Sequence, residues 1–195
     1  MKETGLMFKA PLVRAILSGQ KTQTRRIAKD VRHPDLGNWY APGALVLEGE
    51  PQHVIHRACP LGQPGYRIYV RETWAYGVHA QAAIRDEDGP FVYAADGTTQ
   101  GRLCERWRPS IHMPKHAARI WLEITGVRVE RLQAISEEDA KAEGVDATKY
   151  HGLDRAYARA FSELWESTGG DWAANPWVWV IDFKRIDQPA PKEAP

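Results

Sequence analysis

The sequence predicts a domain of mixed α+β class, in which a few strands form a small barrel or curled sheet flanked by three helices. Residues 119–130 alternate between apolar and polar side chains, which is typical of a strand with one buried face. Residues 177–184 are rich in aromatic and β-branched side chains and predict a second strand. Leu153, Phe161 and Trp165 belong to an apolar stripe at helical spacing. Helices and strands are therefore both expected in one domain.

A short helix and a strand are expected in the N-terminal part of the chain. Pro11 suits the first turn of a helix, and Gly19 suits the position just beyond its end. The apolar residues between them recur at helical spacing, so a helix is predicted over 11–18. Residues 67–70 follow a Pro-Gly turn and alternate in polarity, which predicts a strand.

Two loop-rich insertions are expected within the domain, at about 28–65 and 76–118. The first is rich in Pro, Gly and His, and only residues 44–47 and 53–56 have the composition of short strands. The second contains two Asp-Gly turns and no clear periodicity. Irregular structure is therefore predicted for most of both insertions.

The C-terminal half carries clearer signals. Gly126 predicts a bulge or a turn within the alternating strand. Ser136 begins a sequence that resembles a capping box with Asp in place of Glu, so we expect a helix over 137–143. Residues 187–195 contain three prolines and are expected to form a disordered tail, which leaves a single domain over 1–186.

The composition excludes several classes of protein. The 195 residues carry a formal net charge of +1, which excludes a histone-like binder of polyanions and requires a local basic patch for any contact with nucleic acid. No apolar run approaches about 18 residues, so no membrane partner is expected. Cys59 and Cys104 make no disulfide framework, and the N-terminus lacks a long apolar run. A reducing, cytoplasmic setting is therefore expected.

The densest polar run of the chain is Gly19-Gln20-Lys21-Thr22-Gln23-Thr24-Arg25-Arg26. A Lys three residues before a hydroxyl allows a pairing of nucleophile and base, and threonine is a poor nucleophile without an adjacent base. Burial, or the neighbouring Arg25 and Arg26, would lower the pKa of Lys21 toward a useful value. The alternative is a solvated basic turn in which a Thr hydroxyl caps the backbone. The spacing leaves both interpretations open.

Four further side chains are candidates for binding substrate: Arg26, Arg71, Glu72 and Trp74. The last three follow directly after the strand predicted at 67–70. Glu72 could accept a hydrogen bond from a nucleobase while Trp74 stacks on its ring. An ion pair at a strand end beside a packed Trp is the competing interpretation.

A basic stretch near the middle of the chain is a candidate surface for phosphate groups of RNA, together with Arg25. Its cations are Arg102, Arg106, Arg108, Lys115 and Arg119. They are interleaved with Trp107, which suits contact with a nucleic acid. A solvated surface of the insertion would have the same composition.

No metal and no cofactor are expected. His53-x-x-His56-x-x-Cys59 and His112-x-x-x-His116 have ligand-like spacings, and Cys104 is available. Residues i and i+3 of a strand point to opposite faces, however, and the loop around Pro60 does not match a zinc knuckle. The chain also lacks the GxSxG, P-loop and GxGxxG motifs.

Gly19-x-Lys21-x-x-Thr24-x-Arg26 resembles the signature of the ASCH domain, a branch of the PUA-like superfamily. Further segments are similar to ASCH-domain proteins of phage and prophage type: residues 64–74, 109–114 and 177–181. The resemblance covers most of residues 7–185. It implies a small PUA-like β-barrel with flanking helices, a role related to RNA or nucleosides, and an active-site cleft beside this turn.

The ASCH family includes a small bacterial N4-acetylcytidine amidohydrolase with a catalytic Lys, Thr and Glu. The resemblance implies these roles for Lys21, Thr24 and Glu143, with Glu72 as the second candidate for the carboxylate. This chain differs from that enzyme by its two insertions and by Tyr66, where the family commonly has Asp. These differences concern the substrate more than the cleft.

The resemblance therefore implies a hydrolase of an N-acyl amide on a modified pyrimidine nucleoside. Thr24 would attack the acyl carbon or position the attacking water, and Lys21 would accept the proton. An ion pair with Glu143 would raise the pKa of Lys21, so the pair either shares a proton or Lys21 stays charged and stabilises the oxyanion. An RNA-binding module without catalysis and a metal-independent ribonuclease are the alternatives.

Overall fold

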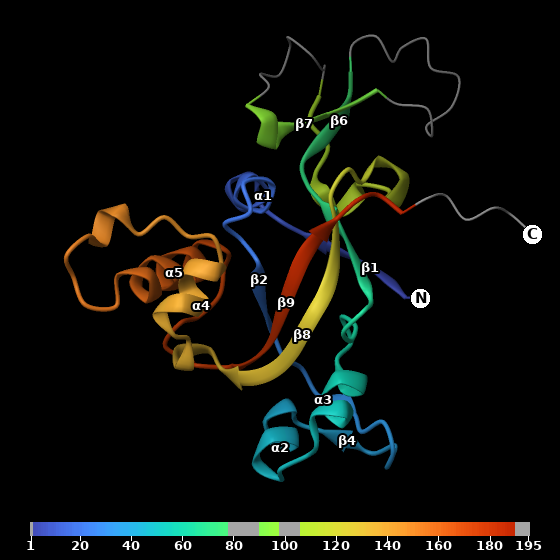
Figure 1. Cartoon of the computed structure of the whole chain (residues 1–195), viewed down its shortest axis with the longest axis vertical. Helices are drawn as coiled ribbons and strands as arrows, with labels where there is room; N and C mark the ends of the chain where they lie inside the picture. The colour runs from blue at the N-terminus through green and yellow to red at the C-terminus, as the bar shows by residue number, and fades with distance from the viewer. Residues whose placement is uncertain (1, 78–89, 98–105, 190–195) are drawn as a thin grey trace, which may run out of the picture.

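The computed structural model describes residues 2–77, 90–97 and 106–189. Its main feature is a five-stranded sheet with the order β1-β5-β8-β9-β2 (Figure 1). β1 and β5 are parallel, and the other neighbours are antiparallel. The strands are β1 (Glu3–Met7), β2 (Gln23–Ile27), β5 (Arg67–Arg71), β8 (Trp121–Arg131) and β9 (Trp177–Ile186). Together with the helices, this sheet gives the mixed α+β class that the sequence predicts.

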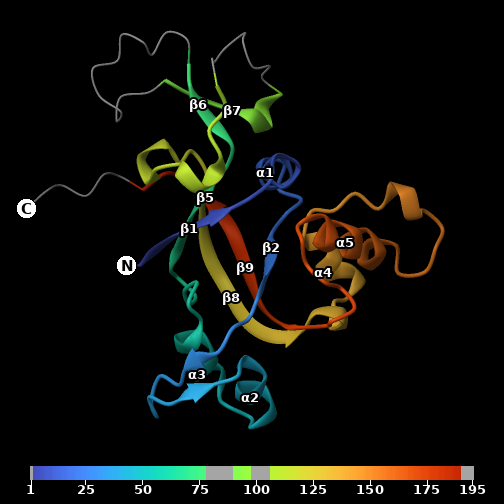
Figure 2. The same cartoon turned by 180° about the vertical axis from the view of Figure 1, so that it is seen from behind.

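The sheet curls, but its two edge strands, β1 and β2, are not joined by a backbone ladder within the described ranges (Figure 2). Instead, the guanidinium of Arg26 on β2 donates to the carbonyl oxygen of Met7 at the end of β1, at 3.0 Å. We call this junction the seam. α1 (Ala10–Leu17) connects the two edge strands and packs Val13 and Ile16 into the core. The barrel that the resemblance implies is thus an open, curled sheet in the part of the chain described.

Several local predictions are confirmed. The helix expected at 11–18 is α1, and the strand expected at 67–70 is β5. Gly19 adopts a φ of +77°, which lets the chain leave the helix in the left-handed region. The pairing of β8 with β9 shifts register between Ile124 and Gly126, which is the predicted bulge.

Two helices, α4 (Glu137–Ala142) and α5 (Ala156–Ser167), lie on one side of the sheet (Figure 1). The side chain of Ser136 accepts a hydrogen bond from the backbone N–H of Asp139 at 3.0 Å, so the predicted cap is confirmed. Phe161 and Trp165 of α5 pack with Val178 of β9 in one hydrophobic cluster. This packing holds both helices against the sheet.

The prediction that Leu153 belongs to the apolar stripe of α5 is wrong, because Leu153 is exposed and precedes the helix. The carboxylate of Glu137 accepts hydrogen bonds from the backbone N–H groups of Tyr157 and Ala158, at 3.0 and 2.9 Å. These donors have no partner inside the helix, so the carboxylate caps α5 at this point. A side chain from α4 therefore sets where α5 begins.

The first insertion is helical where strands were expected. Its elements are β3 (Val31–Arg32), β4 (Trp39–Tyr40), α2 (Pro42–Leu47) and α3 (Gln52–Ala58). The strands predicted at 44–47 and 53–56 are wrong, because Pro42 starts α2 and Pro51 directly precedes α3. A short apolar run does not distinguish a strand from a buried turn of helix.

The second insertion lies at the opposite end of the sheet from α2 and α3 (Figure 1). Its described part contains the antiparallel pair β6 (Trp74–Tyr76) and β7 (Phe91–Tyr93), so it is more regular than expected. Short 3-10 turns follow at Ala94–Asp96, Ser110–His112 and Lys115–Ala117. Much of this insertion, at 78–89 and 98–105, lies outside the described residues.

Beyond β9, residues 187–189 have no regular structure, and the rest of the predicted tail, 190–195, lies outside the described residues. The single domain over 1–186 stays a prediction. None of the helices in the described ranges is long and apolar enough to cross a membrane.

Replacing Gly144 by Ala should destabilise the fold more than replacing Gly152. Both glycines have a positive φ, +76° and +82°, so both substitutions add the same backbone strain. A Cβ at 144 would also lie 2.7 Å from Cβ of Lys21 and 2.8 Å from Cβ of Ala15, whereas a Cβ at 152 meets nothing within 4 Å. We expect urea denaturation to show an extra loss of about 1–3 kcal/mol for Gly144→Ala. Equal losses would contradict this packing.

Candidate functional site

The candidate site centres on a buried ion pair between Lys21 and Glu143. Lys21 lies in the loop between α1 and β2, and Glu143 ends α4. Nζ of Lys21 lies 2.6 Å from Oε2 of Glu143, and it also donates to the carbonyl oxygens of Gln23 at 2.7 Å and of Glu143 at 2.9 Å. The two residues are 2% and 3% exposed. Two of the three residues that the resemblance implies for catalysis are therefore in direct contact.

Burial lowers the pKa of Lys21 below its usual value of 10.5. The carboxylate of Glu143 opposes this effect, and the nearby cations Arg26 and Arg25 add to it. Because burial outweighs the ion pair, the amine loses its proton more readily than that of a surface lysine. The pairing with Glu143 is thus compatible with a role of Lys21 as a base.

Thr24 lies on β2 and is 1% exposed. Its Oγ1 accepts a hydrogen bond from NH1 of Arg26 at 2.7 Å. The ring centroid of Phe8 lies 5.1 Å from the guanidinium of Arg26 and 5.9 Å from the amine of Lys21, so one ring contacts both cations. The described contacts include no hydrogen bond between Nζ of Lys21 and Oγ1 of Thr24. Phe8, which was not among the residues predicted from the sequence, thus lies against Lys21 and Arg26, and Arg26 contacts Thr24.

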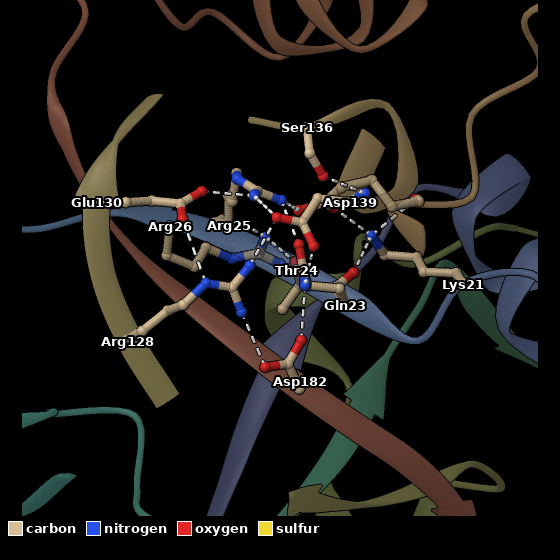
Figure 3. Close-up of polar contacts among 11 residues, drawn as sticks. Lys21, Gln23, Thr24, Arg25, Arg26, Arg128, Glu130, Ser136, Asp139 and Asp182 are labelled. Carbon is tan, nitrogen blue, oxygen red and sulfur yellow. Dashed lines mark hydrogen bonds and ion pairs between the residues drawn. The ribbon is translucent and has the colours of Figure 1, made fainter. Parts of the chain in front are cut away.

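The opposite face of β2 carries a polar network that the sequence analysis also missed (Figure 3). Gln23 and Thr24 point to opposite faces because side chains alternate along a strand. The amide nitrogen of Gln23 donates to Asp139 at 3.1 Å and to Asp182 at 2.6 Å. Arg128 donates to the same two carboxylates, at 2.8 and 2.9 Å. This network joins α4 to β2, β8 and β9.

Arg25, a predicted phosphate contact, belongs to this network and its side chain is fully buried. Its NH2 group lies 2.6 Å from Oε1 of Glu130 and 3.2 Å from Oδ2 of Asp139. Its NH1 group lies 3.1 Å from Oε1 of Glu143. Arg25 therefore lies inside the protein and not on a surface that faces RNA. The sequence signal for this burial was the alternation of side chains along β2, which puts Arg25 on the same face as Gln23.

Glu72 and Trp74, two predicted substrate-binding residues, are packed inside the protein. Nε of Arg119 lies 2.9 Å from Oε1 of Glu72, and Arg119 also pairs with Asp96 at 2.8 Å. Burial raises the pKa of Glu72, and Arg119 opposes this effect. Trp74 is 1% exposed and lies in a hydrophobic cluster with Tyr93. Glu72 thus forms an ion pair at a strand end beside the packed Trp74, which was the alternative to substrate binding. The packing of Trp74 leaves no open ring face on which a base could stack.

Of the other two substrate-binding candidates, Arg26 lies at the seam, and Arg71 lies on β5, the strand that pairs with β1. Arg71 is opposite Met7 in the ladder between β1 and β5, and it donates to the carbonyl oxygen of Ile111. Arg26 donates to the carbonyl oxygen of the same Met7. Met7 is thus the ladder partner of Arg71 and the hydrogen-bond acceptor of Arg26, and Arg26 also contacts Thr24.

The predicted phosphate patch is partly neutralised within the protein. Lys115 and Arg119 form ion pairs with carboxylates. Arg106 and Arg108 are exposed, and the guanidinium of Arg108 lies over two aromatic rings of the second insertion, at 4.7 and 5.4 Å. Arg102 lies outside the described residues. Only part of the predicted patch is therefore available to a polyanion.

The residues that the structure describes include no group of three or more His, Cys, Asp or Glu placed to hold a metal ion. His53 and His56 lie on the helix α3, not on the strand predicted for them. Burial raises the pKa of the Cys59 thiol to about 11, which makes it a poor thiolate ligand. Cys104 lies outside the described residues.

An open groove of about 700 Å³ lies between α1 and α5, close to the ion pair. Its lining includes Gly144, which directly follows Glu143. Gly144 packs against the Cβ end of Lys21, so the groove adjoins the base of that side chain and not its amine. Lys21, Thr24 and Glu143 do not line the groove.

No family model and no curated protein matches the chain. Solved structures to which the chain is similar include an ASCH domain from Lactobacillus crispatus JV V101, with 15% sequence identity and a TM-score of 0.39, over 96% of this chain and 81% of that chain. They also include a protein from Enterococcus faecalis V583 described under the family model DUF984, with 15% identity and a TM-score of 0.40, over 96% of this chain and 77% of that chain.

Removing the charge of Glu143 should destabilise the protein strongly. Glu143→Gln leaves the buried Lys21 and Arg25 without their shared carboxylate, and breaking a buried ion pair costs about 3–5 kcal/mol. Glu138→Gln on the same helix is the matched control, because Glu138 is exposed, and we expect a change within about 0.5 kcal/mol. The free energy of unfolding in urea measures both. If both variants lost only a similar, small amount of free energy of unfolding, the ion pair would not stabilise the fold.

The contribution of Lys21 to stability should rise with pH. The folded protein has the lower pKa, so between that pKa and 10.5 the unfolded chain binds more protons than the folded protein. The free energy of unfolding of the wild type, relative to Lys21→Met, should therefore increase from neutral pH toward 10.5. Urea denaturation at several pH values measures the difference. A difference that falls with pH would mean that the ion pair outweighs burial.

Proposed function

We propose that this chain hydrolyses an N-acyl amide on a modified pyrimidine nucleoside, with N4-acetylcytidine as the test substrate. The observation that carries the proposal is the buried contact of 2.6 Å between Lys21 and Glu143, beside the strand that holds Thr24. These are the three residues for which the resemblance to the ASCH amidohydrolase implies catalysis. Titratable groups with shifted pKa values gather at functional sites more often than elsewhere, and burial lowers the pKa of Lys21.

Thr24 is the proposed nucleophile. Its Oγ1 attacks the acyl carbon, and its proton passes to the neutral amine of Lys21 once substrate brings the groups together. The C–N bond then breaks, and the proton is delivered through the Lys21–Glu143 pair to the leaving N4 nitrogen of the base. Water, deprotonated by Lys21, releases the acyl group from Thr24 as a carboxylic acid. Each proton that Lys21 accepts is returned, so the site is regenerated.

Arg26 is proposed to support this chemistry from the seam. It already donates to Oγ1 of Thr24 at 2.7 Å, so its positive charge favours loss of the hydroxyl proton to Lys21 as the attack begins. It is also more exposed than Lys21, Thr24 and Glu143, which are all buried. We expect substrate to enter at the seam by moving the side chain of Arg26.

A second candidate is an RNA-binding module without catalysis. The exposed guanidinium groups of Arg106 and Arg108 favour it, since neither forms an ion pair with a carboxylate in the described part of the chain. Such a module would bind RNA more weakly as salt increases, and its affinity would survive Thr24→Ala. Cleavage of RNA in the presence of a chelator would instead indicate the metal-independent ribonuclease.

Thr24→Ala should abolish hydrolysis of N4-acetylcytidine, while Thr22→Ala should not. Thr24 supplies the attacking oxygen, and loss of a nucleophile lowers the rate by about a thousandfold or more. Thr22 is an exposed neighbour that undergoes the same change of side chain. Chromatography of released cytidine measures both rates. Absence of turnover by the wild type, or equal turnover by both variants, would falsify the proposal.

A further inference from the structure

We propose that Arg25 is a positioning residue: it holds one oxygen of the Glu143 carboxylate, so that the other oxygen stays on the amine of Lys21. This inference rests on the proposed function, because it assigns Arg25 a part in setting the proton donor and acceptor of that reaction. Position 25 is not a fixed position of the ASCH signature, and the sequence pattern predicted that Arg25 lies on an RNA-binding surface. Its contacts support a different role.

The guanidinium of Arg25 is held in place by several acceptors. NH2 donates to Oε1 of Glu130 at 2.6 Å and to Oδ2 of Asp139 at 3.2 Å, and NH1 donates to Oε1 of Glu143 at 3.1 Å and to the amide oxygen of Gln23. A guanidinium is a planar, rigid fork of donors. Rotating it would break contacts with β8, α4 and β2 at once. Arg25 is therefore a fixed support.

The support fixes the carboxylate of Glu143. Oε1 accepts from Arg25, and Oε2 accepts from Lys21 at 2.6 Å. An ionised carboxylate only accepts hydrogen bonds, and each of its oxygens here faces a cation. If the carboxylate rotated part of the way about the Cγ–Cδ bond of Glu143, both of these contacts would lengthen. Oε2 is thus directed at the amine that the proposed reaction uses.

Arg128 offers a matched comparison in the same network. It donates to Asp139 at 2.8 Å and to Glu130 at 3.2 Å, as Arg25 also contacts both carboxylates. Arg128 makes no described contact with Glu143. Replacing either arginine by lysine keeps the positive charge and removes the fork. Only the change at position 25 should release Glu143.

The test measures the titration of Lys21 in the full chain by NMR, with lysine labelled at the ε-carbon and Lys21→Arg used to identify the signal. In Arg25→Lys, Glu143 is released, and its contact no longer raises the pKa of Lys21. We expect the protonation equilibrium of Lys21 to shift by about tenfold toward the neutral amine. Arg128→Lys should leave it unchanged. In the Glu143→Gln background, Arg25→Lys should have no further effect.

The same variants are assayed for hydrolysis of N4-acetylcytidine across pH. In Arg25→Lys, the pH profile of kcat should move toward lower pH by the same amount as the titration of Lys21. KM should stay unchanged, because Arg25 does not touch substrate. If Arg25→Lys does not fold, Glu130→Gln takes its place, since it removes one of the carboxylates that hold Arg25; we expect a smaller shift in the same direction.

An unchanged titration of Lys21 in Arg25→Lys, or in Glu130→Gln where that variant replaces it, would overturn the proposal. A shift that persists without Glu143 would also overturn it, because Arg25 would then act directly on Lys21. Absence of turnover by the wild type would reject the proposed function alone. The titration would still decide whether Arg25 positions Glu143.

Discussion

The carboxylate of Glu143 joins two buried cations, Lys21 in the loop before β2 and Arg25 within β2. Moving charges out of water costs several kcal/mol per ion, and the contact is favourable only when each charged group keeps good partners. Here both oxygens of the carboxylate face a cation, and the amine of Lys21 has three acceptors. The end of α4 is consequently held in one position against the sheet.

The two faces of β2 carry different parts of the site. Thr24 and Arg26 face the seam, together with Phe8, and they are the hydroxyl and the cation that we propose to contact substrate. Gln23 and Arg25 face α4 and hold the network that fixes the carboxylate. The alternation of side chains along a strand makes this division possible within a few residues. The proposed nucleophile and the network that fixes Glu143 thus lie on the two faces of the same short strand.

The two insertions lie at opposite ends of the sheet, and the first one follows directly after β2 (Figure 1). Arg119, which follows the second insertion, pairs with Asp96 of that insertion and with Glu72, which precedes it. In the first, Gln52 of α3 donates to the carbonyl oxygen of Val127 on β8 at 2.6 Å, which ties the insertion to the sheet. Both insertions add contacts to the sheet while leaving the loop that holds Lys21 intact. Their charged and aromatic side chains serve packing in several places where the sequence suggested binding.

The long strands, α1, α4 and the bulge follow from the sequence pattern, because periodicity, caps and glycines act over a few neighbouring residues. The sequence also singled out Lys21, Thr24 and Glu143, through a resemblance carried by a short motif. Tertiary structure alone decided that Arg25 and Trp74 are buried, that short apolar runs of the first insertion are helices, and that Arg26 joins the sheet edges. Local patterns do not encode these outcomes, because burial and ion pairing depend on which distant segments arrive beside a residue.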